Sequence, residues 1–145
     1  MTESNPVKIL LVEDSPTDAD LAIRALQQGR LNNQVTHVSD GVEAMSFLRN
    51  EGDYQTAERP DLILLDLNMP RMDGRQVLQN IRADSTLKSI PVVVLTTSDQ
   101  EADVAAAYDL FSNAYIVKPV NLERFFGIIR EIDQFWFHVA RLPAS

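Results

Sequence analysis

The stretch DLILLDLNMPRMDG, residues 61–74, places an unbroken apolar run directly before an aspartate and a turn-rich segment. The run, residues 62–65, contains only Leu and Ile, without the alternation that is typical of a strand with one face in water. Strands that helices bury on both faces have this composition. We therefore expect residues 62–65 to form a central strand of a parallel sheet, with Asp66 at its carboxyl end.

Four further apolar runs lie along the chain, at residues 7–12, 35–38, 91–95 and 114–117. Between the runs lie segments with helical spacing, carried by Leu21, Ala22, Ala25 and Leu26 and then by Val42, Met45, Phe47 and Leu48. Five alternations of strand and helix predict an α/β fold, a doubly wound five-stranded parallel sheet with helices on both faces. The polar, turn-forming segment 50–60 is predicted to be a long surface loop.

Length and composition indicate one soluble domain over residues 1–145, with a core of about 7–132 and a helical extension of about 133–145. The net charge of −8 argues against nucleic acid or anionic lipid as a direct partner. The absence of cysteine excludes disulfides, zinc-thiolate sites and thiol nucleophiles. The N-terminus reaches acidic residues after one short apolar run, so we expect neither a signal peptide nor a membrane span, and a cytoplasmic protein.

Polar residues follow four of the runs, where parallel strands end at one edge of the sheet. They are Glu13 and Asp14, Asp66, Thr96 and Lys118. A lone aspartate after a strand is more often a turn or cap residue, so the convergence of three carboxylates carries the inference. Clustered carboxylates suit a hard cation such as Mg²⁺. Lys118 and Thr96 complement a phosphoryl group on or near Asp66.

Four motifs carry a resemblance to a known family. They are LVED at 11–14, DLILLDLNMPRMDG at 61–74, VVLTTS at 93–98 and YIVKP at 115–119. In this order and at these strand ends they resemble the receiver domain of bacterial response regulators, over about residues 7–132. The resemblance implies a (βα)5 flavodoxin-like fold and a two-component signalling function. It also implies a domain that catalyses only its own phosphorylation and dephosphorylation.

The resemblance assigns the metal and phosphoryl roles residue by residue. It implies that Asp66 accepts a phosphoryl group from a sensor histidine kinase. It implies that Asp14, Asp66 and the backbone carbonyl of Asn68 bind Mg²⁺, while Glu13 acts on the metal through water.

The same resemblance assigns the switch residues. Thr96 would donate a hydrogen bond to the phosphoryl oxygens, and Lys118 would form an ion pair with them. Tyr115 would be the aromatic side chain whose rotamer follows the movement of Thr96. Phosphorylation would then alter a docking surface on the domain.

The C-terminal segment NLERFFGIIREIDQFWFHVARLP, residues 121–143, has apolar residues over about 200° of a helix. One stripe of this helix consists of Ile128, Ile132, Phe135 and Val139. A wide core-facing side is one explanation, and a homodimer interface is the other. The ending and the VVLTTS strand resemble the single-domain regulators that pair with bacterial phytochromes and dimerise through this region. That resemblance implies a bacterial phytochrome as the kinase.

Three other functions fit parts of the pattern. A haloacid-dehalogenase-type Mg²⁺ phosphohydrolase also uses an aspartate after a strand, but it needs a second acid two residues later, where this chain has Asn68. A flavodoxin-like cofactor binder needs a glycine-rich phosphate loop, and the five glycines are scattered. A degenerate receiver used as a scaffold is disfavoured by the complete set of acids, Thr96 and Lys118.

Overall fold

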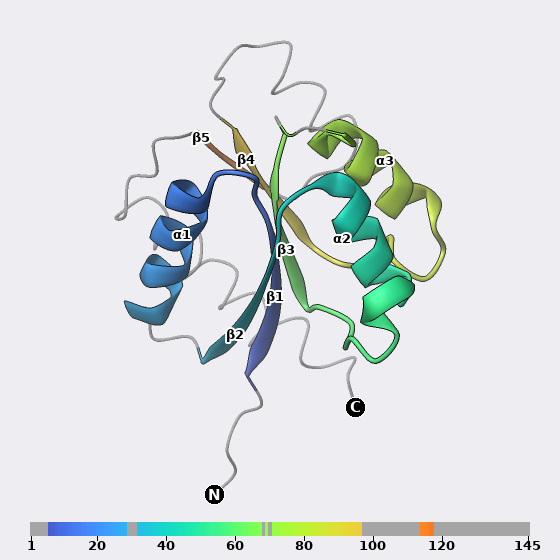
Figure 1. The fold of residues 1–145 in the computed structure, drawn as a ribbon, viewed down its shortest axis with the longest axis horizontal. Helices are drawn as coiled ribbons and strands as arrows, with labels where there is room; N and C mark the ends of the chain where they lie inside the picture. The colour runs from blue at the N-terminus through green and yellow to red at the C-terminus, as the bar shows by residue number, and fades with distance from the viewer. Residues whose placement is uncertain (1–5, 29–31, 68, 70, 97–113, 118–145) are drawn as a thin grey trace, which may run out of the picture.

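Five parallel strands form the centre of the molecule in this computed structural model (Figure 1). Residues 6–28, 32–67, 69, 71–96 and 114–117 are those that the structure describes. The strands are β1 (Val7–Val12), β2 (Asn33–Val38), β3 (Leu62–Asp66), β4 (Val92–Thr96) and β5 (Ala114–Val117). Their order across the sheet is β2-β1-β3-β4-β5, and every neighbouring pair is parallel. The predicted five-stranded parallel sheet is therefore confirmed, with all carboxyl ends at one edge.

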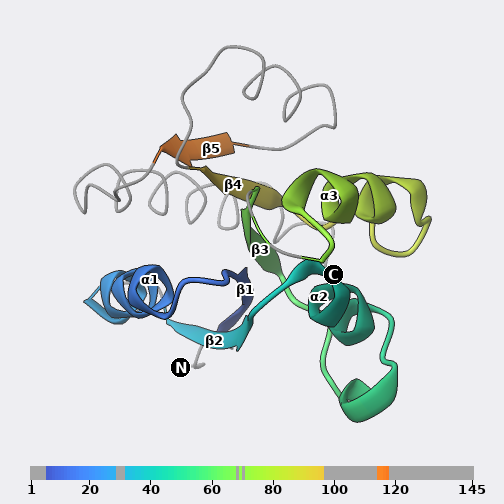
Figure 2. The ribbon, with the colours of Figure 1, turned by 45° about the horizontal axis from the view of Figure 1, so that its top comes forward.

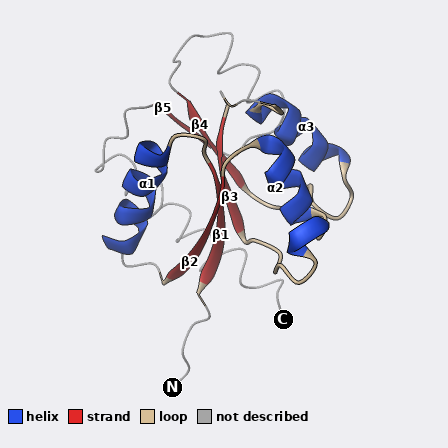
Figure 3. Ribbon diagram, in the orientation of Figure 1, coloured by secondary structure: helices blue, strands red, loops and turns tan. Residues whose placement is uncertain are grey.

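Helices cover both faces of this sheet, as predicted. Helix α1 (Pro16–Gln28) lies on one face, while α2 (Gly41–Leu48) and α3 (Gly74–Ala83) lie on the other (Figures 1 and 2). The helices, drawn in blue in Figure 3, flank the red strands. None of the helices in the described part of the chain combines the length and apolar content needed to cross a bilayer.

Alternate residues of the central strands supply two separate cores. In β3, Leu62 and Leu64 pack with the buried alanines of α1, whereas Ile63 and Leu65 pack with α2 and α3. All five residues of β3 are buried. The uniform apolar composition of the run at 62–65 thus reflects a strand with helices on each side.

The helices begin close to strand ends because side chains cap their first turns. Ser15 Oγ accepts a hydrogen bond from the Asp18 backbone N–H at 3.2 Å, and Pro16 occupies the first position of α1. Asp73 and Gln76 form a reciprocal capping box at the start of α3. These caps fix the first residues of α1 and α3, which follow β1 and β3 in the chain.

Three details differ from the sequence-based expectations. Strand β4 ends one residue later than predicted, at Thr96, and begins one residue later, after Pro91. Pro91 has no N–H, but its carbonyl oxygen accepts a hydrogen bond from the Ile63 N–H. Val42 is 40% exposed, and Ala44 takes a buried position in α2 instead. The segment 50–60 contains a 3₁₀-helix, η1 (Gly52–Tyr54), whose Tyr54 ring packs edge-on against Phe47.

Candidate functional site

Three carboxylates converge at the carboxyl edge of the sheet. Glu13 and Asp14 directly follow β1, and Asp66 is the last residue of β3. Strands β1 and β3 are neighbours, with Val12 opposite Leu65. One carboxylate oxygen from each of the three residues lies within 4.8 Å of the other two. The structure thus confirms that these acids, far apart in sequence, form one cluster.

Burial makes this cluster electrostatically unusual. Glu13 is 1% exposed and Asp66 is 2% exposed, whereas Asp14 is open to solvent. Charged carboxylates buried side by side repel one another and lose hydration. A bound cation would supply compensating charge, and the exposed Asp14 leaves the cluster accessible from solvent.

The donor set fits a divalent metal ion of the Mg²⁺ type. Such ions prefer oxygen ligands at about 2.0–2.1 Å, which places opposite ligands of an octahedron about 4.2 Å apart. Three carboxylate oxygens that all lie within 4.8 Å of one another can face a common ion. One or two protein carboxylates, together with water and phosphate oxygens, are the usual ligands of Mg²⁺.

The backbone around Glu13 holds this side chain at the sheet edge. The Glu13 N–H donates to the Val38 carbonyl at 3.0 Å, and the Ser15 N–H donates to Glu13 Oε2 at 3.2 Å. A ring nitrogen of His37, Nε2, lies 2.7 Å from the Glu13 carbonyl oxygen, and because a carbonyl oxygen can only accept, the Nε2–H group donates here. Sequence reasoning does not find His37, because its contact follows from which strand lies beside β1.

The segment after Asp66 continues from the sheet into α3. The Leu67 N–H donates to the Leu95 carbonyl at 3.0 Å, which extends the pairing of β3 with β4 past Asp66. The Gly74 N–H donates to the Leu67 carbonyl, also at 3.0 Å. These bonds close residues 67–74 into a loop whose two ends meet beside Asp66.

The remaining predicted site residues are distributed as follows. Thr96 is the last residue of β4, next to the strand of Asp66, and Tyr115 is the second residue of β5. Asn68 and Lys118 lie outside the described residues. So do the four residues of the predicted dimer interface, Ile128, Ile132, Phe135 and Val139.

Comparisons with known proteins identify the family of this chain. Residues 9–130 match the sequence model of the response regulator receiver domain. The chain is 47% identical to response regulator Rcp1 of Synechocystis sp. over 144 residues, which cover 99% of this chain and 98% of that protein.

Two solved structures are similar over most of this chain. One is the phosphorylated cyanobacterial phytochrome response regulator RcpA, with a TM-score of 0.81 and 51% identity. The other is the Mn²⁺-bound form of Rcp1, with a TM-score of 0.80 and 46% identity. Each alignment covers 92% of this chain and 96% of the other chain.

Proposed function

The chain belongs to the response regulator receiver family, and from this premise we propose that Asp66 accepts a phosphoryl group from a sensor histidine kinase. The convergence of Glu13, Asp14 and Asp66 at the sheet edge carries the proposal. Asp66 is the acid of this cluster that ends a central strand. It pairs with Leu95 of β4, and the preceding residue, Leu65, pairs with Val12 of β1. A fixed carboxylate oxygen is what an in-line attack on phosphorus requires.

The transfer step needs positioning and charge neutralisation more than additional covalent chemistry. One carboxylate oxygen of Asp66 forms a bond to phosphorus while the bond between phosphorus and the kinase imidazole breaks. The leaving imidazole nitrogen takes up a proton. We propose that Lys118 and Thr96 contact the phosphoryl oxygens and that Tyr115 responds to the movement of Thr96, as the family resemblance implies.

We propose Mg²⁺ as the metal ion of this site. Glu13, Asp14 and Asp66 would hold it with the backbone carbonyl of Asn68, and Glu13 would act through water. When bound, the ion neutralises charge that develops on the phosphoryl oxygens. The relative Rcp1 has been solved in a Mn²⁺-bound form, which supports a divalent-metal site in this family.

Membership of the receiver family gives no support to the haloacid-dehalogenase alternative. A phosphohydrolase would protonate its leaving group with an acid two residues after the nucleophile, and this chain has Asn68 there. We propose that the domain catalyses only its own phosphorylation and dephosphorylation. The phosphorylated Asp66 then persists as a signal that alters a docking surface.

We propose a bacterial phytochrome as the kinase partner and a homodimer as the assembly. The proposal draws on the similarity to Rcp1 and to RcpA, which is a cyanobacterial phytochrome response regulator. The dimer would form through Ile128, Ile132, Phe135 and Val139. These residues form one apolar stripe in the sequence of the C-terminal segment.

The phosphoacceptor is tested by intact-mass measurement after incubation with acetyl phosphate and Mg²⁺. We expect wild type to gain one phosphoryl mass and Asp66→Asn to gain none. Asp61→Asn is the matched control, because Asp61 lies just before the opposite end of β3, where its Oδ2 accepts a bond from the Lys8 N–H. We expect this control to be labelled like wild type. Undiminished labelling of Asp66→Asn would reject the assignment.

A further inference from the structure

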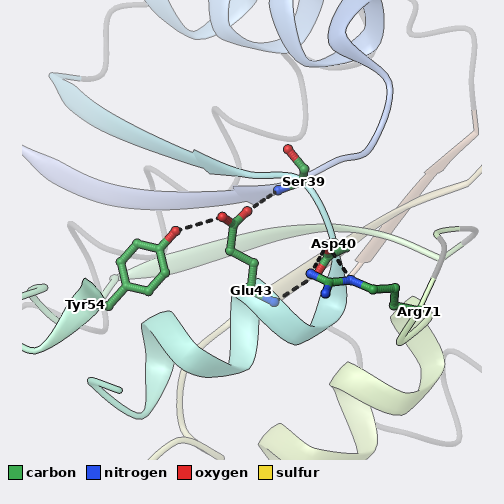
Figure 4. Close-up of polar contacts among 5 residues, drawn as sticks. All are labelled: Ser39, Asp40, Glu43, Tyr54 and Arg71. Atoms are coloured by element: carbon green, nitrogen blue, oxygen red, sulfur yellow. Dashed lines mark hydrogen bonds and ion pairs between the residues drawn. The ribbon is translucent and has the colours of Figure 1, made fainter. Parts of the chain in front are cut away.

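An ion pair joins the loop after Asp66 to the start of α2. Arg71 Nε donates to Asp40 Oδ2 at 3.0 Å, and Arg71 Nη2 donates to the same oxygen (Figure 4). The Asp40 side chain is only 14% exposed, while that of Arg71 is 59% exposed. The two residues are 31 positions apart in sequence, so the contact is a tertiary one.

The Asp40 end of this pair is firmly held. Asp40 Oδ1 accepts a bond from the Glu43 backbone N–H at 2.8 Å and thereby caps α2. Glu43 in turn accepts from the Ser39 N–H at 2.8 Å and from the Tyr54 hydroxyl at 3.0 Å (Figure 4). The carboxylate that Arg71 reaches is therefore oriented by its own helix and not by Arg71 alone.

The Arg71 end belongs to the loop between β3 and α3. Arg71 has a φ of 65°, a conformation that L residues adopt at a cost. Close packing adds to the contact, because a β-carbon on Gly41, the first residue of α2, would lie 2.1 Å from the Met72 carbonyl oxygen. The loop after Asp66 thus rests on the start of α2 through two adjacent residues, Arg71 and Met72.

We propose that the Arg71–Asp40 ion pair positions the loop after Asp66 and thereby sets the affinity of the site for its metal ion. This inference rests on the proposed function, in which the Asn68 carbonyl, three residues before Arg71, is a metal ligand. Mg²⁺ demands near-ideal octahedral geometry, so a loop with more freedom presents that ligand less well. Arg71 and Asp40 are positioning residues that act through the loop.

Two substitutions remove the pair without removing other known contacts. Arg71→Gly deletes the guanidinium and suits the positive φ. Asp40→Asn keeps an oxygen for the cap on α2, since Asn is as good an N-cap as Asp, but it loses the charge. Arg71→Lys keeps the charge and loses the planar fork, so it gives a conservative third variant.

The measurement is the dissociation constant for Mg²⁺, obtained by calorimetric titration of the full chain. An ion pair in which one partner is open to solvent supports an effect of about two- to fivefold. We expect Arg71→Gly and Asp40→Asn each to raise the dissociation constant by that factor. The double variant should bind Mg²⁺ no more weakly than either single variant, because the two single variants and the double variant all lose the same interaction. Arg71→Lys should lie between wild type and Arg71→Gly.

The signs of the two effects separate positioning from simple electrostatics. A site that loses a nearby positive charge attracts a cation more strongly. A site that loses a nearby negative charge attracts it less strongly. Electrostatics alone therefore predicts that Arg71→Gly tightens binding while Asp40→Asn weakens it. Positioning predicts that both variants bind Mg²⁺ more weakly.

A second ion pair provides the control. Arg24 and Asp20 pair at 3.0 Å on the surface of α1, so Arg24→Gln removes the same charge at a site away from the loop. It should bind Mg²⁺ like wild type. Thermal melts without metal report whether each variant is folded. Opposite signs, additive losses or unchanged affinity in the variants would overturn the inference, whereas a wild type that binds no Mg²⁺ would overturn the proposed metal site itself.

Discussion

A β-carbon on Gly74 would lie 2.3 Å from the backbone carbonyl oxygen of Asp66. The next atom it would meet is Leu67 Cα, at 2.6 Å. Both distances are far shorter than any real contact of a β-carbon, and both neighbours are backbone atoms that cannot swing aside. The first residue of α3 therefore packs directly against the residue that we propose as the phosphoacceptor, and only glycine permits this approach.

Gly74→Ala should consequently destabilise the domain and disturb the site together. Overpacking of this kind costs about 1–3 kcal/mol. We expect a loss of that size in the free energy of unfolding measured in urea, and slower labelling by acetyl phosphate. Gly52→Asn is the control: nothing lies within 4 Å of a β-carbon on Gly52, and Asn tolerates the positive φ of 59° at this position. That variant should stay within about 0.5 kcal/mol of wild type. Equal losses at both positions would contradict the packing argument.

Asp14→Ala should abolish stabilisation of the fold by Mg²⁺. A ligand at one hundred times its dissociation constant stabilises the native state by about 2.7 kcal/mol. We expect wild type to show this gain and Asp14→Ala to show almost none, because the accessible carboxylate of the cluster is gone. Thermal melts with and without Mg²⁺ provide the measurement. Asp20→Ala, an exposed acid on α1, should respond to Mg²⁺ like wild type. A full metal-dependent shift in Asp14→Ala would mean that the cluster is misassigned.

The contribution of Asp40 to stability should depend on pH. Burial alone would raise the pKa of Asp40, but bonds from the Glu43 N–H and the Arg71 guanidinium favour the ionised form and hold the pKa below its ordinary value. In the unfolded chain the side chain titrates at about 3.9, so below that pH the unfolded state binds more protons. The stabilisation is fully present above this value and is lost as the pH falls through the lower pKa of the folded state.

Urea unfolding of wild type and Asp40→Asn tests this expectation. The difference in unfolding free energy between the two proteins should be constant between about pH 7 and pH 5 and should shrink below about pH 4. Asn cannot ionise, so its own curve supplies the reference for all other titrating groups. A difference that does not change with pH would show that the charge of Asp40 contributes nothing.

The C-terminal segment should mediate self-association. Full burial of an Ile, Phe or Val side chain stabilises by about 1.5–3 kcal/mol before association entropy is subtracted. We expect wild type to sediment as a symmetric dimer at tens of micromolar. A double variant, Ile128→Ser with Phe135→Ser, should sediment as a folded monomer that still accepts a phosphoryl group. A monomeric wild type, with or without acetyl phosphate, would assign the stripe to the core.

Much of the fold could be read from local patterns. The run at 62–65 predicts a strand buried on both faces, and the structure buries alternate residues of β3 under opposite helices. The exposure of Val42 shows the limit of such patterns, because helical spacing does not say which side of α2 faces the sheet.

The acidic residues of the candidate site could be predicted from the sequence, but the contacts that hold the surrounding backbone could not. Glu13, Asp14 and Asp66 follow apolar runs, and parallel strands bring their carboxyl ends to one edge. No local signal marks Arg71 as the partner of Asp40, or His37 as a neighbour of the Glu13 carbonyl. These contacts join segments that are far apart in the chain, and no repeating pattern in the sequence relates the two residues of either contact.

Hydrophobic periodicity is a local property, so it was enough to predict the succession of strands and helices. Alternation of strands with helices implies parallel strands, whose carboxyl ends share one edge, and this placed the acids together. The tertiary structure decided the geometry of the site: the 4.8 Å limit among the three carboxylates, the contact of Gly74 with Asp66, and the ion pair between Arg71 and Asp40. Each of these depends on how two elements dock. Docking is set by packing summed over whole faces, which no single stretch of sequence encodes.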